Sequence, residues 1–298
     1  MSADSARVKP EIDLGDINDS RVVAIGRVPA NSRVLDLGLA SGSVARSLRE
    51  MGCRVWGVGL DPDAAEMAPD VCEEIIEADL NSPGIIELLG DQKFDVILML
   101  DVLEHLSNPA ALLQALPKVL ADNGWAVISL PNVAHASLRL DLLQGRFNYS
   151  EPGPSGHTQL RFFDRQGVDD LLDEAGWRAF DLARVIRAVD VSEFQVLGVD
   201  PELTRQLESD IEALTQQFVL TVAPLGSPVL TDRPVLPAAI AQTALLEAVR
   251  RIGELDEEVR QLRMHHLPDL ADQLSEIRVK VIERKSKLKD ILVAIRES

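Results

Sequence analysis

The sequence predicts an α/β protein built on a doubly wound, mostly parallel sheet of seven strands, followed by a helical tail. From residue 32 onward, short apolar runs alternate with stretches whose apolar residues recur at helical spacing. This alternation is typical of a parallel sheet covered by helices on both faces. The chain has 298 residues, of which 46% are hydrophobic. That length suits one domain of about 200 residues with an appendage.

Five strand-like runs come first, at residues 33–37, 54–58, 74–78, 94–99 and 125–130. Helical patterns separate them: one spans 43–51 and ends at Gly52, a second begins near Pro62, and a third spans 108–124. Pro131 ends the fifth strand because it has no N–H to donate.

The pattern continues with a loop or lid at 145–156, a helix at 166–176 and two strands at 177–186 and 217–222. Seven strands with helices between the first five predict a doubly wound sheet. The ligand of such a sheet binds beyond the carboxyl ends of its strands.

The last part of the chain differs in kind. Four prolines between 224 and 237 mark a linker. Apolar residues then recur in alternating steps of three and four, at Leu245, Ala248, Ile252, Leu255, Val259 and Leu262. A second series, shifted in phase, starts after Pro268, which predicts two helical segments. We expect a domain at 1–226, a proline-rich linker at 227–237 and a coiled coil at 238–298, and we favour self-association over a helix packed on its own domain.

Charge and cysteine content narrow the choice of partners. The formal net charge of -18 repels nucleic-acid phosphates and anionic lipid. No run approaches the roughly 18 apolar residues of a membrane helix. The two cysteines, Cys53 and Cys72, lie in predicted core elements, which indicates a reducing compartment. We therefore expect a cytoplasmic protein with no nucleic-acid partner and no insertion into a membrane.

The first predicted strand leads into a glycine-bearing turn, Asp36-Leu37-Gly38-Leu39-Ala40-Ser41-Gly42. Such a turn lets the backbone approach a nucleotide-like ligand closely. Taken alone, this motif is also compatible with a dehydrogenase. Acidic residues follow the third and fourth strands, in EADL at 77–80 and in FDVILMLDVLEHLSNP at 94–109.

With VLDLGLASG at 34–42, these stretches resemble the class I S-adenosylmethionine-dependent methyltransferases, which have a Rossmann-like fold. The chain is similar in particular to a bacterial subgroup associated with surface-polysaccharide and glycosyltransferase systems. Three further stretches, at 125–149, 157–177 and 212–224, continue the resemblance, which extends over about 200 residues.

The resemblance implies a role for each matching residue. Asp36, Gly38, Ala40 and Gly42 would hold the methionine end of S-adenosylmethionine, and Ala40 stands where a glycine is usual. Asp79 would accept a hydrogen bond from the adenine amino group, with Leu80 against the ring. Asp101 would face the methionine moiety or the acceptor.

One position departs from the family. The second strand of its members normally ends with an acid that binds both ribose hydroxyls, and here that position is Gly59. Loss of such a contact costs about 1.5–3 kcal/mol. Asp61 either bends back to replace the acid or caps the helix at Pro62, and the cap is the favoured role.

If the segment after the fourth strand is helical, Asp101, Glu104 and His105 share one face and are candidate ligands of a divalent ion. Some metal-dependent O-methyltransferases of this fold have a similar arrangement, with a further histidine that His157 or His135 would supply. The favoured alternative is that Glu104 and His105 cap and pack the helix.

Methyl transfer to a hydroxyl benefits from a general base, for which His157 and His135 are the candidates. The family often has histidine where this chain has Gln159.

The sequence supports two functional hypotheses. The first is an S-adenosylmethionine-dependent O-methyltransferase that acts on a sugar or glycan intermediate of polysaccharide biosynthesis. The second is a catalytically inactive methyltransferase-like scaffold that oligomerises and organises a polysaccharide assembly complex. In either case, the expected partners are a small-molecule or glycan acceptor, a second copy of the chain, and a glycosyltransferase or polysaccharide assembly protein. An NAD-dependent dehydrogenase is a distant third, because it too needs an acid at position 59.

Overall fold

The structure is a computed structural model. It describes residues 12–39, 42–60, 71–82, 84–147, 158–187, 202, 206–207 and 209–231. Its strands are β1 (Arg33–Leu37), β2 (Arg54–Gly59), β3 (Glu74–Glu77), β4 (Phe94–Leu100), β5 (Leu120–Pro131), β6 (Trp177–Ile186) and β7 (Thr215–Pro224). Its α-helices are α1 (Ser20–Ile25), α2 (Ser43–Glu50), α4 (Pro109–Ala115), α5 (Ala136–Leu143), α6 (Arg165–Ala175) and α9 (Ile211–Leu214). Short 3-10 turns are η1 (Glu87–Leu89), η2 (Leu103–His105), η3 (Leu116–Lys118) and η4 (Pro228–Leu230).

The seven strands form one sheet in the order β3-β2-β1-β4-β5-β7-β6. The first five strands are parallel to their neighbours, and β7 runs antiparallel between β5 and β6. The strand order reverses between β1 and β4, and doubly wound sheets bind their ligands at such a point, beyond the carboxyl ends of the strands. The predicted doubly wound, mostly parallel sheet is therefore confirmed.

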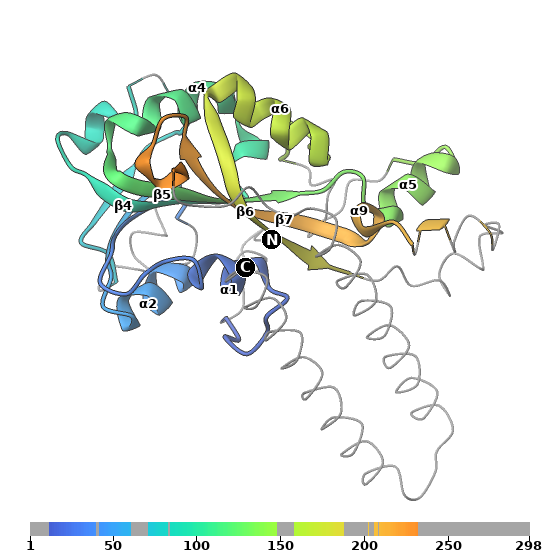
Figure 1. Cartoon of the computed structure of the whole chain (residues 1–298), viewed down its shortest axis with the longest axis horizontal. Helices are drawn as coiled ribbons and strands as arrows, with labels where there is room; N and C mark the ends of the chain where they lie inside the picture. The colour runs from blue at the N-terminus through green and yellow to red at the C-terminus, as the bar shows by residue number, and fades with distance from the viewer. Residues whose placement is uncertain are drawn as a thin grey trace, which may run out of the picture. The chain divides into compact units, whose positions relative to one another are not determined.

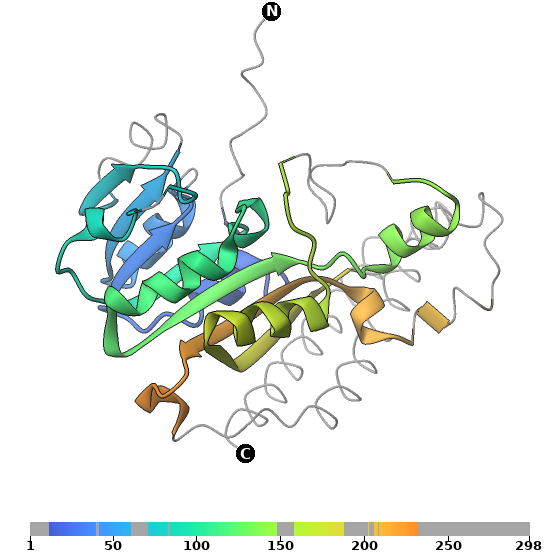
Figure 2. The same ribbon diagram turned by 90° about the horizontal axis from the view of Figure 1, so that it is seen from above.

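Helices cover both faces of the sheet, α4 and α6 on one and α1 and α2 on the other (Figures 1 and 2). Alternate strand residues supply the two cores, because successive side chains point to opposite faces. Leu35, Ile97 and Ile128 pack under α4 and α6. Val34 and Val96 pack with α1 and α2. Each core includes residues of both β1 and β4, the two strands at the switch point, and so fixes the positions of these strands.

Helix α4 is shorter than the sequence predicts. The expected helix at 108–124 ends at Ala115, and after one 3-10 turn β5 already begins at Leu120. Pro117 explains the difference, because it lacks an N–H and its ring clashes with the carbonyl of the preceding helical turn. Asn108 is the N-cap of α4, and its Oδ1 accepts the Ala111 N–H at 3.1 Å.

The chain divides into two compact units, residues 1–187 with 212–236, and residues 188–211 with 237–298. Most of the second unit, with the coiled coil predicted at 238–298 and its break near Pro268, lies outside the described residues. The helix predicted near Pro62 does so too. No helix of the described part is long and apolar enough to cross a membrane.

Candidate cofactor and acceptor site

The glycine turn follows β1 at the switch point. Gly38 has a φ of 89°, and a Cβ atom added there would lie 2.5 Å from Val102 Cγ2. The N–H groups of Gly38 and Leu39 both donate to the Val58 carbonyl, at 2.8 and 2.9 Å. Gly42, with a φ of 70°, is the N-cap of α2. Glycine adopts the positive φ angles of this turn most easily. The turn therefore allows a ligand at the carboxyl ends of the strands to approach the backbone closely.

Asp36 is buried within β1, with 6% of its surface exposed. Its charge acts on Cys72: burial, with a smaller contribution from Asp36, raises the pKa of the Cys72 thiol to about 11. Cys72 therefore stays protonated at neutral pH and is a poor nucleophile. Ala40, the other predicted methionine-end residue of this turn, lies outside the described residues.

The end of β2 is closed by the backbone of the same turn. A Cβ atom at Gly59 would lie 2.7 Å from the Leu39 carbonyl oxygen, and one at Gly57 would lie 2.5 Å from Leu39 Cδ2. Leu39 itself is buried. The two glycines of β2 thus make room for Leu39, and an acidic side chain at position 59 is not compatible with this path. Asp61, the other candidate for the ribose, lies outside the described residues.

Asp79 follows β3 and is tied to its own turn. Asp79 Oδ1 accepts the Asn81 N–H at 2.8 Å and Asn81 Nδ2 at 3.2 Å. Asn81 Oδ1 in turn accepts both the N–H and the hydroxyl of Ser107, at 2.8 and 2.9 Å. Leu80 packs against the core beneath. The loop after β3 is therefore bonded to the loop that precedes α4, which fixes where the Asp79 carboxylate lies.

Asp101 directly follows β4 and has a left-handed conformation, with a φ of 58°. This backbone region is uncommon outside glycine, although aspartate tolerates it better than most residues. Asp101 Oδ1 accepts the Ser129 hydroxyl at 2.8 Å and also the amide of Gln217. Strands β5 and β7 thus orient one carboxylate at the switch point.

The charge of Asp101 also reaches Arg21 on α1. The hydrogen bond with Asp19, at 2.5 Å from Arg21 Nη2, raises the pKa of Arg21, and the charge of Asp101 raises it further. Arg21, Ser129 and Gln217 were not predicted from the sequence. They come from elements far apart in the chain, and only the strand order of the sheet, β4-β5-β7, brings Ser129 of β5 and Gln217 of β7 to Asp101.

The segment from Asp101 to His105 does not form the helix that the metal hypothesis needs. Asp101 is left-handed, and only Leu103–His105 form a 3-10 turn, so the three candidate ligands do not share a helix face. Glu104 is 1% exposed, and His105 Nδ1 bonds the Thr158 carbonyl oxygen at 2.9 Å. Within the described part of the chain, no group of three His, Cys, Asp or Glu side chains could hold a metal ion. Asp101, Glu104 and His105 therefore do not fit a divalent ion.

His135 is the N-cap of α5 and is buried, with 4% of its surface exposed. Its Nδ1 accepts the Ser137 N–H at 3.3 Å, and its Nε2 lies 3.1 Å from the Arg187 carbonyl oxygen, to which it donates. Burial lowers the pKa of His135, and the nearby Arg187 and Arg139 charges lower it further. With both ring nitrogens engaged, His135 is a structural residue rather than the predicted base. His157, the other candidate, lies outside the described residues.

The described residues are compatible with the roles expected at the two ends of S-adenosylmethionine. The glycine turn would allow a close backbone approach for the methionine end, and Asp79 with Leu80 would offer a carboxylate and an apolar side chain for the adenine. At position 59, the carbonyl of Leu39 lies where the family's acidic side chain would begin. Together, the topology and the glycine turn define a Rossmann-like domain that binds a nucleoside cofactor at the carboxyl edge of its sheet.

A family model described as a methyltransferase domain matches residues 16–182, more than half of the chain. The chain belongs to this family: it contains a class I methyltransferase domain, for which S-adenosylmethionine is the cofactor.

Among curated proteins, the chain is similar to the ubiquinone biosynthesis O-methyltransferases of Xylella fastidiosa and Xanthomonas axonopodis. It is 30% and 26% identical to them over 143 residues, or 46% of this chain. The match spans only 58% and 60% of the lengths of these relatives. A solved Burkholderia thailandensis 1,6-didemethyltoxoflavin-N1-methyltransferase, with bound S-adenosylhomocysteine, is 19% identical with a TM-score of 0.45; the match covers 69% of this chain and 76% of that one.

Proposed function

We propose that the chain is an O-methyltransferase that transfers a methyl group from S-adenosylmethionine to a hydroxyl of a sugar or glycan intermediate of polysaccharide biosynthesis. One observation carries the proposal. A carboxylate in a left-handed backbone, Asp101, is oriented by Ser129 and Gln217 at the switch point. Val102, the next residue, lies against the glycine turn at Gly38. Strained, oriented polar groups of this kind are concentrated at functional sites.

Bound S-adenosylmethionine supplies an activated methyl group, so the protein has mainly to align the acceptor oxygen with it. Asp36, Gly38, Ala40 and Gly42 would hold the methionine end of the cofactor. Asp101 would face the sulfonium or the acceptor. These roles rest on the resemblance to the family and on the placement of the described residues at one edge of the sheet.

His157 is the base that we propose for the acceptor hydroxyl. It directly precedes Thr158, whose carbonyl oxygen lies 2.9 Å from His105 Nδ1. His105 is four residues after Asp101 in the sequence. His135 is excluded from this role by its buried contacts with Ser137 and Arg187. A His157→Gln variant should lose most turnover and retain its affinity for S-adenosylhomocysteine, since a base acts on the acceptor and not on the cofactor.

The names of the curated relatives favour a second acceptor class, a hydroxyl of an intermediate of ubiquinone biosynthesis. Both classes place an oxygen nucleophile at the methyl group. An assay of S-adenosylhomocysteine release with sugar nucleotides, lipid-linked glycans and hydroxylated aromatic compounds distinguishes them. Turnover with only the aromatic compounds would contradict the glycan proposal.

The alternative function is an inactive scaffold that organises a polysaccharide assembly complex with a glycosyltransferase or a second copy of itself. The closed position at Gly59 and the alanine at position 40 favour it. Calorimetry with S-adenosylmethionine separates the two functions. Heat of binding that saturates at micromolar ligand supports the enzyme, and no binding at millimolar ligand supports the scaffold.

A further inference from the structure

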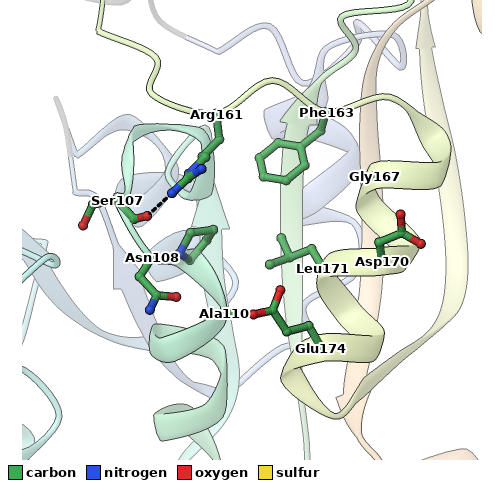
Figure 3. Close-up of a pocket in the computed structure, with 10 residues that line it drawn as sticks. Ser107, Asn108, Ala110, Arg161, Phe163, Gly167, Asp170, Leu171 and Glu174 are labelled. Atoms are coloured by element: carbon green, nitrogen blue, oxygen red, sulfur yellow. Dashed lines mark hydrogen bonds between the residues drawn. The ribbon is translucent and has the colours of Figure 1, made fainter.

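Four polar residues form a continuous chain from the loop after β3 to the segment before α6. Asp79 Oδ1 accepts from Asn81, and Asn81 Oδ1 accepts twice from Ser107. The Ser107 carbonyl oxygen then accepts from Arg161 Nη2 at 2.6 Å. Figure 3 shows this last bond, with the Arg161 side chain reaching across toward Ser107. The orientation of the Asn81 amide is fixed by these bonds, because its oxygen accepts from Ser107 and its NH₂ donates to Asp79.

The Arg161 end of this chain is fixed by backbone bonds as well. The carbonyl oxygen of Glu104 accepts both the Leu160 and the Arg161 N–H groups, at 2.8 and 2.9 Å. Phe163, two residues on, is buried and accepts the Val133 N–H at 2.9 Å. The segment 158–163 is thus attached to the turn after β4 and to the residues after β5.

A pocket of about 490 Å³ lies between α4 and α6, directly beside the bond from Arg161 to Ser107 (Figure 3). Arg161, Asp170 and Glu174 are on its rim, and Phe163 and Leu171 form its apolar part. Solvent in this pocket reaches Arg161, so the bond to Ser107 is partly exposed. An exposed bond of this kind contributes less than a buried one, which limits the effect to be expected from Arg161 itself.

We propose that Asn81, Ser107 and Arg161 are positioning residues that couple cofactor binding at Asp79 to the order of the segment 158–163. The proposal rests on the adenine role of Asp79 in the proposed function. When adenine engages Asp79, the turn 79–82 loses alternative conformations, and the Asn81 amide is held in the orientation that Ser107 requires. Ser107 and Glu104 then hold Arg161 and Leu160 more firmly. Because such coupling is reciprocal, an acceptor that orders 158–163 also tightens the cofactor.

The coupling has a consequence for the reaction. Residue 157, the proposed base, immediately precedes the coupled segment. Cofactor binding would therefore help to place the group that acts on the acceptor.

The test uses the full chain and S-adenosylhomocysteine, with two readouts. Calorimetry should show affinity lowered roughly 3- to 10-fold in Asn81→Ala and about 3-fold in Arg161→Met, with the affinity of Arg161→Lys close to that of wild type. Arg178→Met, at an exposed arginine of β6, is the matched control and should bind as wild type. Hydrogen exchange of the Leu160 and Arg161 amides should slow in wild type when the ligand saturates. It should not slow in Asn81→Ala, even at saturation.

Unchanged affinity in both Asn81→Ala and Arg161→Met, or slowed exchange in saturated Asn81→Ala, would overturn the coupling while the methyltransferase proposal stands. A wild-type chain that fails to bind S-adenosylhomocysteine would overturn both. A merely structural role of Asn81 lowers the melting temperature but leaves the exchange response to the ligand intact. The exchange readout therefore separates coupling from loss of stability.

Discussion

The carbonyl oxygen of Leu39 lies 2.7 Å from the position that a Cβ atom of residue 59 would occupy. The contact is with backbone, so it is not relieved by rotation of a side chain. The glycine turn and the end of β2 therefore pack closely against each other. This packing leaves no room for an acidic side chain at position 59.

The first prediction concerns this contact. The family pattern suggests that Gly59→Glu tightens cofactor binding, but the structure predicts the opposite. Gly59→Ala should already destabilise the fold by about 1–3 kcal/mol through overpacking. Gly59→Glu should bind S-adenosylhomocysteine no better than wild type. Denaturant unfolding and calorimetry measure the two effects, and tighter binding by Gly59→Glu would show that the turn moves aside to admit the acid.

The second prediction concerns the charge of Asp101. S-adenosylmethionine carries a positive sulfur and S-adenosylhomocysteine does not. If Asp101 faces the sulfonium, Asp101→Asn should weaken S-adenosylmethionine by about 1–2 kcal/mol and its demethylated product by much less. Asparagine retains an oxygen for Ser129 and Gln217, so folding should be little affected.

Calorimetry with both ligands checks this prediction, with the exposed Asp122→Asn as a control. An equal loss for the two ligands would place Asp101 away from the sulfur and toward the acceptor.

Much of the sheet could be predicted from the sequence because its strands are continuous apolar runs, as in Phe94 to Met99. The predicted strands also placed Asp36, Asp79 and Asp101 at or near the carboxyl ends of the first, third and fourth strands. The contacts of Asp101 could not be predicted, since Ser129 and Gln217 are neighbours only through the pairing of β5 with β7. The closure of Gly59 by Leu39 depends on the path of a turn, which no periodicity specifies.

Other differences have local causes. Helix α5 was not predicted because its apolar residues surround the helix: Leu138 and Leu140 are buried, whereas Leu142 and Leu143 are exposed. The metal hypothesis assumed a helix from Asp101, but the left-handed backbone at Asp101 separates it from Glu104 and His105.

The third prediction concerns His135 and pH. Burial lowers the pKa of His135 from its usual value of 6.5, so the folded protein favours the neutral ring. The contribution of this group to stability is fully present above pH 6.5. It is lost as the pH falls below 6.5 toward the folded-state pKa, because the unfolded chain then binds a proton that the folded chain does not. Denaturant unfolding between pH 7.5 and 5 should show this loss, and His135→Gln should reduce its slope.

A second variant, His135→Ala, tests the role of the residue. His135→Ala should destabilise the fold by about 1–2 kcal/mol through loss of the cap and of the bond to Arg187. Turnover per folded molecule should stay close to wild type. A fall in turnover of 100-fold or more in a stably folded His135 variant would restore it as the base.

The last prediction concerns the tail, which lies outside the described residues. The heptad series that includes Leu245, Ile252, Leu255 and Leu262 would expose an apolar stripe to water if residues 238–298 formed a lone helix. We expect these residues to oligomerise the chain, most simply as a dimer. A chain that ends at Thr231 retains η4, which contacts β5, and so should stay folded, bind S-adenosylhomocysteine as the full chain does, and be monomeric. Light scattering on both lengths gives the masses. Leu255→Asp in the full chain is a second way to break the stripe without truncation and should also give a monomer, whereas Glu257→Lys, off the stripe, should not. A monomeric full-length chain, or a shortened chain that unfolds, would mean that the tail packs on its own domain.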